Sequence, residues 1–243
     1  MTKPIIFNTD MVHALLDGRK TVTRRTAFKA DELREFRTQS NADGWWFRGR
    51  VFSSFDAAMN SVCGVMKLRK FRPGDILWVR ETWQFIPCID CRMYEYRSCN
   101  DVPVTYDDGN IIGEGCFVYR ADYPETDRIS WRPSIHMPRA AARIFLRVTD
   151  VRVERLRCLT LEQAHMEGQP RCNGGLAVCG GTQSCQDCEA DTGNAVRWFS
   201  GIWDNTIKPA DRVTFGWDAN PWVWVIGFEQ ISKEAFKDET ERS

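Results

Sequence analysis

The sequence has no excess of charge of either sign and no long apolar run. Lysine and arginine together number 33, and so do aspartate and glutamate, so the formal net charge is zero. Proteins that coat duplex DNA carry a basic excess, so any contact with nucleic acid here must be local. No stretch is apolar enough to span a bilayer, and the N-terminus lacks the apolar core of a signal peptide. We therefore expect a cytoplasmic protein without a membrane partner.

Several catalytic fingerprints are also missing. There is no Gly-x-Ser-x-Gly elbow, no Walker loop and no dinucleotide-binding glycine pattern. The three histidines are scattered and no zincin helix is present. A zinc deaminase would need His-x-Glu before Pro-Cys-x-x-Cys, and Pro87-Cys88-Ile-Asp-Cys91 supplies only the second half. We expect no cofactor for catalysis.

Cysteine, in contrast, is plentiful, with ten residues. In the cytoplasm they are more plausibly thiols or metal ligands than disulfides. Two C-x-x-C pairs would form a closed tetrahedral zinc site if they met. The alternatives are a local site completed by other cysteines of the second loop, or free thiols. The predicted ligands of a structural zinc are Cys88, Cys91, Cys185 and Cys188, and the competing ligands are Cys172 and Cys179.

Local signals predict short helices and strands. Asn8, Thr9 and Asp10 are N-cap candidates for a helix that Gly18 would end, and Thr160-Leu-Glu-Gln163 has the form of a capping box. Apolar residues in helical register over 194–207 predict an amphipathic helix. Strands are predicted at 4–7, 76–79, 116–120 and 220–228, and over 143–156 as two strands separated by a bulge or bend at Thr149-Asp150.

Many short strands without a βαβ rhythm predict an α+β fold built on a small mixed β-barrel with short flanking helices. We expect one domain over residues 1–232. Two long loop insertions would interrupt it at about 84–114 and 169–193. Residues 233–243 are rich in charge and are expected to form a flexible tail.

A basic turn follows the first predicted helix. Arg19, Lys20, Arg24 and Arg25 would be favourable there simply because cations stabilise a helix C-terminus. Thr21 and Thr23, which lie among these cations, suggest a second interpretation. A buried lysine can act as the base for a neighbouring hydroxyl, which then acts as a nucleophile.

Glu167 is placed in the last turn of the predicted helix over 161–167. A carboxylate there meets the negative end of the helix dipole, which raises its pKa and suits a proton donor. The alternative is a solvated glutamate at a frayed helix end.

The segment Gly18-Arg-Lys-Thr-Val-Thr-Arg-Arg25 resembles the ASCH signature Gly-x-Lys-x-x-Glu-x-Arg, with Thr23 at the glutamate position. The bacterial N4-acetylcytidine amidohydrolases of that superfamily also have threonine there. The resemblance implies a PUA-like fold, with Lys20 as general base and Thr23 as nucleophile. The stretch Ala164-His-Met-Glu167 is similar to the segment that carries their glutamate, which implies Glu167 as proton donor.

Longer segments resemble uncharacterised phage and prophage ASCH-like proteins, namely Pro73 to Trp83, Trp131 to Arg139 and Trp217 to Val225. Arginine and tryptophan are residues that bind phosphates and stack on bases. We therefore expect a substrate surface drawn from Arg24, Arg25, Trp78, Arg80, Glu81, Trp83, Trp131 and Arg139. The alternative is that Trp131 packs in the core and that Arg80-Glu81 is an ordinary ion pair.

Two functions from different classes follow. The first is an amidohydrolase that removes an acyl group from N4-modified cytosine in a nucleoside or base. The second is a non-catalytic PUA-like module of phage or prophage origin that binds RNA or single-stranded DNA, and a third is a phage protein that acts through protein contacts. The enzyme requires Lys20, Thr23 and Glu167 to converge within about 3–4 Å in a pocket. A phage-encoded chain would work in the host cytoplasm.

Overall fold

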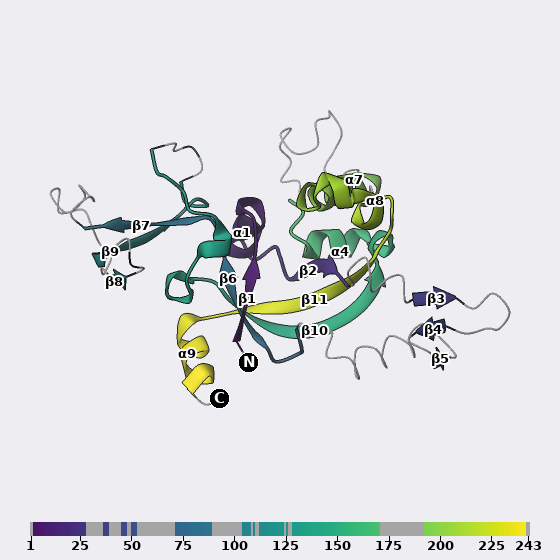
Figure 1. Cartoon of the computed structure of the whole chain (residues 1–243), viewed down its shortest axis with the longest axis horizontal. Coiled ribbons are helices and arrows are strands. Elements are labelled where there is room, and N and C mark those ends of the chain that lie inside the picture. Colours follow the sequence, from purple (N-terminus) through teal and green to yellow (C-terminus); the bar gives the residue numbers. More distant parts are fainter. Residues whose placement is uncertain are drawn as a thin grey trace. The chain divides into compact units, whose positions relative to one another are not determined.

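The computed structural model contains both helices and strands, so the protein is an α+β protein. It describes residues 2–27, 36–38, 45–47, 50–52, 71–88, 104–107, 109, 112–123, 125, 128–170 and 192–241. The chain divides into two compact units (Figure 1). Unit 1 comprises Met1–Leu16, Ile76–Leu146 and Ile231–Ser243, and unit 2 comprises Asp17–Asp75 and Arg147–Gln230. Within the described ranges, no helix combines the length and the apolar character that crossing a membrane requires.

Unit 1 is built on a parallel pair of strands, β1 (Thr2–Ile6) and β6 (Ile76–Arg80). Helix α1 (Thr9–Leu16) follows β1. Asn8 Oδ1 accepts a hydrogen bond of 2.9 Å from the Met11 N–H, and Gly18 has a φ of 71° beyond the helix end. The predicted cap and the predicted glycine stop are both confirmed.

The rest of unit 1 includes a three-stranded antiparallel sheet in the order β7-β9-β8. Its strands are β7 (Trp83–Pro87), β8 (Val104–Asp107) and β9 (Ile112–Tyr119). The prediction of a loop insertion at about 84–114 therefore differs from the structure, in which most described residues of that range are in strands. Gly115 makes the pairing possible, because a side chain there would collide with the Ile86 carbonyl and the Phe85 ring.

Helix α9 (Lys233–Glu241) replaces the expected flexible tail. Its Phe236 is buried and stacks on Phe145, with the ring centroids 4.1 Å apart. This segment is rich in charged residues, but its Phe236 side chain packs into the core of unit 1. Other members of that core are Ile76, Trp78, Trp83, Phe85, Met137, Ala141 and Ala142.

Hydrogen bonding gives one sheet with the strand order β1-β6-β10-β11-β2. Unit 2 contains β2 (Val22–Thr26) and most of β10 (Phe145–Arg155) and β11 (Trp222–Ile231). In unit 2, β2 pairs antiparallel with β11. The order ends at β1 and at β2, so the described strands form an open sheet, not the closed barrel that was expected. A separate three-stranded antiparallel sheet of unit 2 contains β3 (Phe36–Thr38), β4 (Trp45–Phe47) and β5 (Arg50–Phe52).

Strand β10 is continuous where two strands were predicted. Thr149 and Asp150 are both exposed, between buried Val148 and Val151, which explains the change of phase in the sequence. Gly227 of β11 lies against them, since a Cβ there would be 3.2 Å from Thr149 Oγ1. The side-chain alternation changes without the strand ending.

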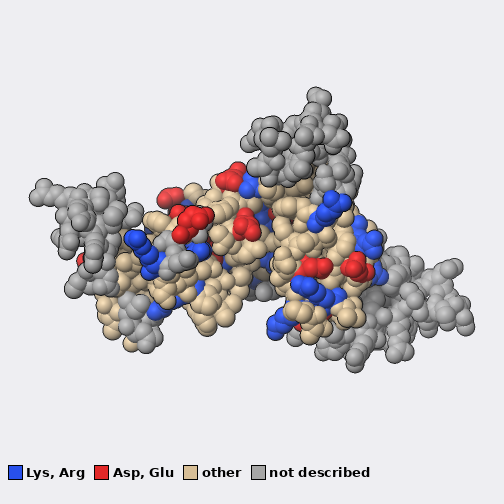
Figure 2. Space-filling view, turned by 90° about the horizontal axis from the view of Figure 1, so that it is seen from above, with Lys and Arg blue, Asp and Glu red and all other residues tan. Residues whose placement is uncertain are grey.

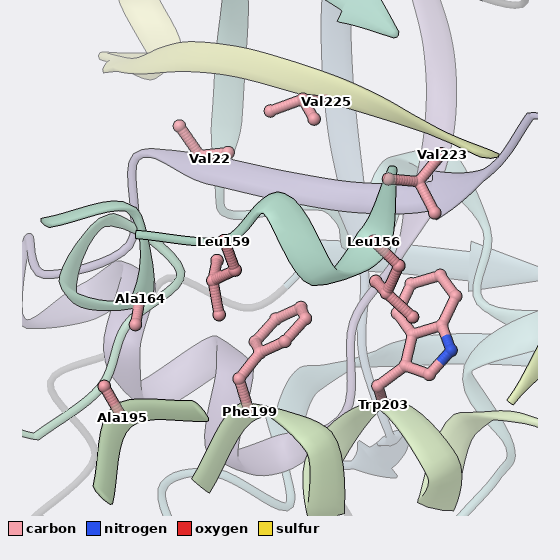
Figure 3. Close-up of a cluster of buried hydrophobic side chains, with 9 residues drawn as sticks. All are labelled: Val22, Leu156, Leu159, Ala164, Ala195, Phe199, Trp203, Val223 and Val225. Carbon is pink, nitrogen blue, oxygen red and sulfur yellow. The ribbon is translucent and has the colours of Figure 1, made fainter. Parts of the chain in front are cut away.

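Unit 2 also holds η3 (Leu156–Cys158), α4 (Leu161–Met166), α7 (Thr192–Thr206), η4 (Pro209–Asp211) and α8 (Arg212–Phe215). Figure 3 shows Phe199 and Trp203 of α7 pointing toward β2 and β11. Both aromatic side chains are buried with Leu156 and Leu159. The predicted amphipathic helix over 194–207 is confirmed, and its apolar face forms the core of this unit.

The predicted capping box of α4 is present. Thr160 Oγ1 accepts from the Gln163 N–H at 3.2 Å, and Gln163 Oε1 accepts from the Thr160 N–H at 3.2 Å. Replacing Thr160 with alanine should lower the free energy of unfolding by about 1 kcal/mol, because one N–H at the helix start loses its acceptor. Urea denaturation measures this. A Thr160→Ser variant keeps the hydroxyl and should remain within a few tenths of a kcal/mol of wild type. Equal losses in the two variants would show that the cap is not responsible.

Candidate active site

The main chain brings Lys20 and Glu167 together within unit 2. Lys20 lies shortly before β2, which begins at Val22, and Glu167 is the C-cap residue of α4. The two residues form an isolated antiparallel bridge. Next to it, the Thr21 N–H donates to the Met166 carbonyl at 2.8 Å. Residues 147 positions apart in the sequence thus meet through backbone hydrogen bonds.

The Lys20 and Glu167 side chains form a buried ion pair. Lys20 Nζ lies 2.7 Å from Glu167 Oε2 and 2.9 Å from the Glu167 carbonyl oxygen. The side chains are 0% and 2% exposed. Burial lowers the pKa of the Lys20 amine, because desolvation disfavours its charged form. The charges of Arg25 and Arg24 act in the same direction, whereas Glu167 opposes them.

Arg24 is the second cation on this carboxylate. Its Nη1 donates to Glu167 Oε1 at 2.9 Å, and its Nη2 donates to Gln163 Oε1 at 2.8 Å. Glu154 Oε2 lies 3.4 Å from Nη2. The sequence indicated Gln163 only as a capping residue and gave no indication of Glu154. Glu154 stands between Val153 and Arg155, and no sequence pattern distinguishes it from the other charged residues of that strand.

Thr23 is buried, and its hydroxyl has no hydrogen-bond partner within the part of the chain that the structure describes. The enzyme hypothesis required Lys20, Thr23 and Glu167 to converge, but among the described residues Thr23 Oγ1 makes no hydrogen bond with either of the other two. Alternation along β2 puts Val22 and Arg24 on one face and Thr23 on the other. The structure thus joins two of the three predicted catalytic residues. An unsatisfied buried hydroxyl costs about 1–3 kcal/mol, so Thr23 stands out among the buried polar residues of unit 2.

Arg25 is half-buried, and its Nη1 donates to the Arg24 carbonyl at 3.1 Å. Burial lowers the pKa of its guanidinium, and the charge of Glu167 acts against that shift. Arg24 and Arg25 were both predicted to bind substrate. Arg24 instead has a completely buried side chain bound to protein oxygens, whereas Arg25 keeps part of its surface accessible.

The predicted base-stacking residues of unit 1 are mostly core residues. Trp83 is 0% exposed and packs against Tyr106 and Phe117, and Trp78 is 7% exposed in the same cluster. The Trp78 face carries the Arg80 guanidinium, 4.7 Å from its ring centroid. Neither indole has a free face for a base.

Glu81 is buried and paired. Arg143 Nε lies 2.9 Å from Glu81 Oε1, and Arg143 Nη1 lies 2.7 Å from Asp122 Oδ2. Burial raises the pKa of Glu81, and the bond to Arg143 counteracts part of that rise. Within the described residues, Glu81 is paired with Arg143 and not with Arg80, which was the alternative interpretation of the Arg80-Glu81 sequence. Arg80 Nη1 instead donates to the Ile135 carbonyl at 3.0 Å.

Trp131 and Arg139 lie in a segment that was predicted to be extended. It contains two short 3-10 turns, η1 (Ser134–His136) and η2 (Arg139–Ala141). Trp131 is half-buried, with the Arg120 guanidinium 5.7 Å from its ring centroid. Arg139 is exposed and lies over the Phe236 ring at 5.0 Å. It borders a hollow of about 320 Å³ in unit 1 that Lys233 and Lys237 also line.

The zinc prediction stays a prediction. Of its four ligands only Cys88 belongs to the described residues, while Cys91, Cys185 and Cys188 lie outside them. The competing ligands Cys172 and Cys179 lie outside as well. Within the described ranges no group of three or more histidine, cysteine, aspartate or glutamate side chains is arranged to hold a metal ion.

Fold and site together define an α+β protein with a buried lysine–glutamate pair held between a strand and the end of a short helix. No family model, no curated protein and no solved structure matches the chain.

Proposed function

We propose that this chain is an amidohydrolase that removes the acyl group from N4-acylated cytosine in a nucleoside or base. The buried contact of 2.7 Å between Lys20 Nζ and Glu167 Oε2 is the observation that carries the proposal. The resemblance of Gly18 to Arg25 to the ASCH signature supplies the reaction. The proposal includes an ASCH-type, PUA-like fold and a location in the cytoplasm, that of the host if the chain is phage-encoded.

Burial makes Lys20 suitable as a base. A lysine whose pKa is lowered by desolvation has a larger neutral fraction near pH 7, and a neutral amine accepts a proton. Glu167 Oε2 is close enough to take the proton that the amine must lose first. Transfer within the pair would generate a neutral lysine and a protonated glutamate, which are the general base and the proton donor that the reaction needs.

The proposed reaction then proceeds in balanced steps. The neutral Lys20 amine takes the Thr23 hydroxyl proton as the oxygen bonds to the acyl carbonyl carbon. The C–N4 bond breaks, N4 receives the proton of Glu167, and cytidine leaves an acyl ester on Thr23. Water hydrolyses the ester to the carboxylic acid and restores Thr23. This sequence requires Thr23 to approach Lys20 when substrate binds, and apo geometry often tightens in that way.

The binding-module alternative would place Lys20 on a basic surface that faces solvent. Lys20 is buried instead, with a side-chain exposure of 0%. On the face drawn in Figure 2, lysine and arginine are interspersed with aspartate and glutamate and do not gather in one patch. Both observations favour the enzyme over the module.

A panel of N4-acylated cytidines tests the proposal, with cytidine release followed by chromatography. Wild type should turn over at least one member. Lys20→Arg, which keeps the charge but cannot act as a base, and Glu167→Gln, which keeps the shape, should each reduce kcat by about 10²–10⁴-fold. The matched control is Glu229→Gln, because Glu229 pairs with Arg147 on the surface. It should retain full activity. Absence of turnover on the whole panel, together with measurable binding of RNA or single-stranded DNA, would favour the module.

A further inference from the structure

The side chain of Arg24 is 0% exposed, yet it comes from a strand next to the site. Two of its nitrogens donate to protein oxygens, Nη1 to Glu167 and Nη2 to Gln163. Its guanidinium also lies 5.7 Å from the Phe199 ring centroid. Contacts from α4 and α7 therefore hold this group, so it is built into the protein and does not face a ligand.

Each oxygen of the Glu167 carboxylate accepts a hydrogen bond from a different cation, Arg24 or Lys20. Oε1 accepts from Arg24 at 2.9 Å, and Oε2 accepts from Lys20 at 2.7 Å. Turning the carboxylate plane out of this orientation would break both contacts. Because Arg24 occupies Oε1, Lys20 meets Oε2.

Gln163 couples this arrangement to the start of α4. Its side-chain oxygen accepts from the Thr160 N–H at 3.2 Å and from Arg24 Nη2 at 2.8 Å. The capping box holds the amide of Gln163 in place, and the amide in turn orients the guanidinium. A continuous hydrogen-bonded path thus runs from Thr160 through Gln163 and Arg24 to Glu167.

We propose that Arg24 is a positioning residue, which holds Oε1 of Glu167 so that Oε2 is reserved for proton exchange with the Lys20 amine. The consequence for turnover depends on the amidohydrolase activity proposed above, whereas the consequence for Lys20 does not. Arg24 acts through Glu167 and does not touch the substrate.

The charges around Lys20 determine the direction of the expected effect. Glu167 faces the amine from the end of α4, and Arg24 and Arg25 face it from β2. Gln163 and Glu154 face Arg24. Because the charge of Arg24 helps to lower the pKa of Lys20, its removal should let the amine keep its proton to higher pH. The proposed mechanism uses the pair with one proton shared between Lys20 and Glu167. The falling limb of the pH–rate profile, where that proton is lost, should then move to higher pH.

The experiment combines NMR titration of the Lys20 side chain without substrate and pH profiles of kcat and KM on N4-acetylcytidine. The Lys20 signal is assigned by its loss in Lys20→Arg. In Arg24→Gln the Lys20 midpoint should move to higher pH, because one of the charges that lower the pKa of Lys20 is lost. The value of kcat at pH 7 should fall about tenfold, and KM should change less than about threefold. The control is Arg197→Gln, which removes the same charge from an exposed position of α7 and should change none of these values.

The Arg24→Lys variant distinguishes the effect of the Arg24 hydrogen-bond geometry from the effect of its charge. It is also the variant to use if Arg24→Gln does not fold. It keeps the charge, so the Lys20 midpoint should stay near that of wild type. It cannot hold both Glu167 and Gln163, so kcat should fall about tenfold. Wild-type kcat in Arg24→Lys, or an increase in KM with kcat unchanged in Arg24→Gln, would overturn the positioning role. A chain inactive on every acylated cytidine that still shows the titration shift would refute the proposed function and support the role of Arg24.

Discussion

Replacing Glu167 with alanine is expected to lower the free energy of unfolding by about 3–5 kcal/mol, the typical cost of removing one partner from a buried ion pair. Lys20 and Arg24 both donate to this carboxylate, and both side chains are 0% exposed. Without Glu167 two neighbouring buried cations would lack their shared anion. Urea denaturation followed by circular dichroism measures the change.

The matched comparison is Glu229→Ala. Glu229 Oε1 lies 2.6 Å from Arg147 Nη1, which is as close as the buried contact, but the Glu229 side chain is 53% exposed and that of Arg147 is 35% exposed. Exposed pairs contribute about 0–1 kcal/mol, so this variant should unfold close to wild type. The two substitutions remove the same atoms and differ mainly in burial. Similar losses in both variants would contradict the view that burial makes the Glu167 contacts indispensable.

Trp83→Ala is expected to lower the free energy of unfolding by about 3–5 kcal/mol. Trp83 is 0% exposed, and its ring centroid lies 6.0 Å from Tyr106 and 5.7 Å from Phe117. Its removal would leave a cavity between the sheet of β7, β8 and β9 and the rest of the core of unit 1. Thermal and urea denaturation should both report the loss.

Tyr123→Ala is the control for Trp83→Ala, because Tyr123 is an aromatic residue of the same unit that is 48% exposed. It should change the free energy of unfolding by less than about 0.5 kcal/mol. A Trp83→Ala variant that unfolds like wild type but binds cytidine derivatives more weakly would restore the base-stacking role expected from the sequence. The structure favours a packing role, since no face of this indole is accessible.

Local signals predicted the local structure well. The cap at Asn8, the glycine stop at Gly18 and the capping box at Thr160 are each specified by a few neighbouring residues. The helix over 194–207 follows from a period that repeats for several turns. The pairing of Lys20 with Glu167 was also expected, although only through a resemblance between short motifs.

Interactions between distant segments were harder to predict. The change of phase at Thr149-Asp150 suggested a break, but exposure of both residues within one strand produces the same pattern. Helix α9 has the charged composition that is typical of a tail, but its Phe236 stacks on the distant Phe145. The bond between Arg24 and Gln163 joins residues 139 positions apart, and no local pattern of the chain encodes such a contact.

Trp78 and Trp83 show a further limit of sequence reasoning. A buried indole and a base-stacking indole have the same composition signal, and only exposure distinguishes them. Residue type alone therefore led to the prediction that Trp78 and Trp83, which are buried, lie on the substrate surface.

The junction between the residues before β2 and the end of α4 contains main-chain hydrogen bonds that do not depend on side-chain identity. Thr21 N–H donates to the Met166 carbonyl, and the Lys20–Glu167 bridge pairs the backbones themselves. A variant with other side chains at positions 20 and 167 can form the same main-chain contacts. Substitution of the Lys20 and Glu167 side chains would therefore leave these main-chain contacts available.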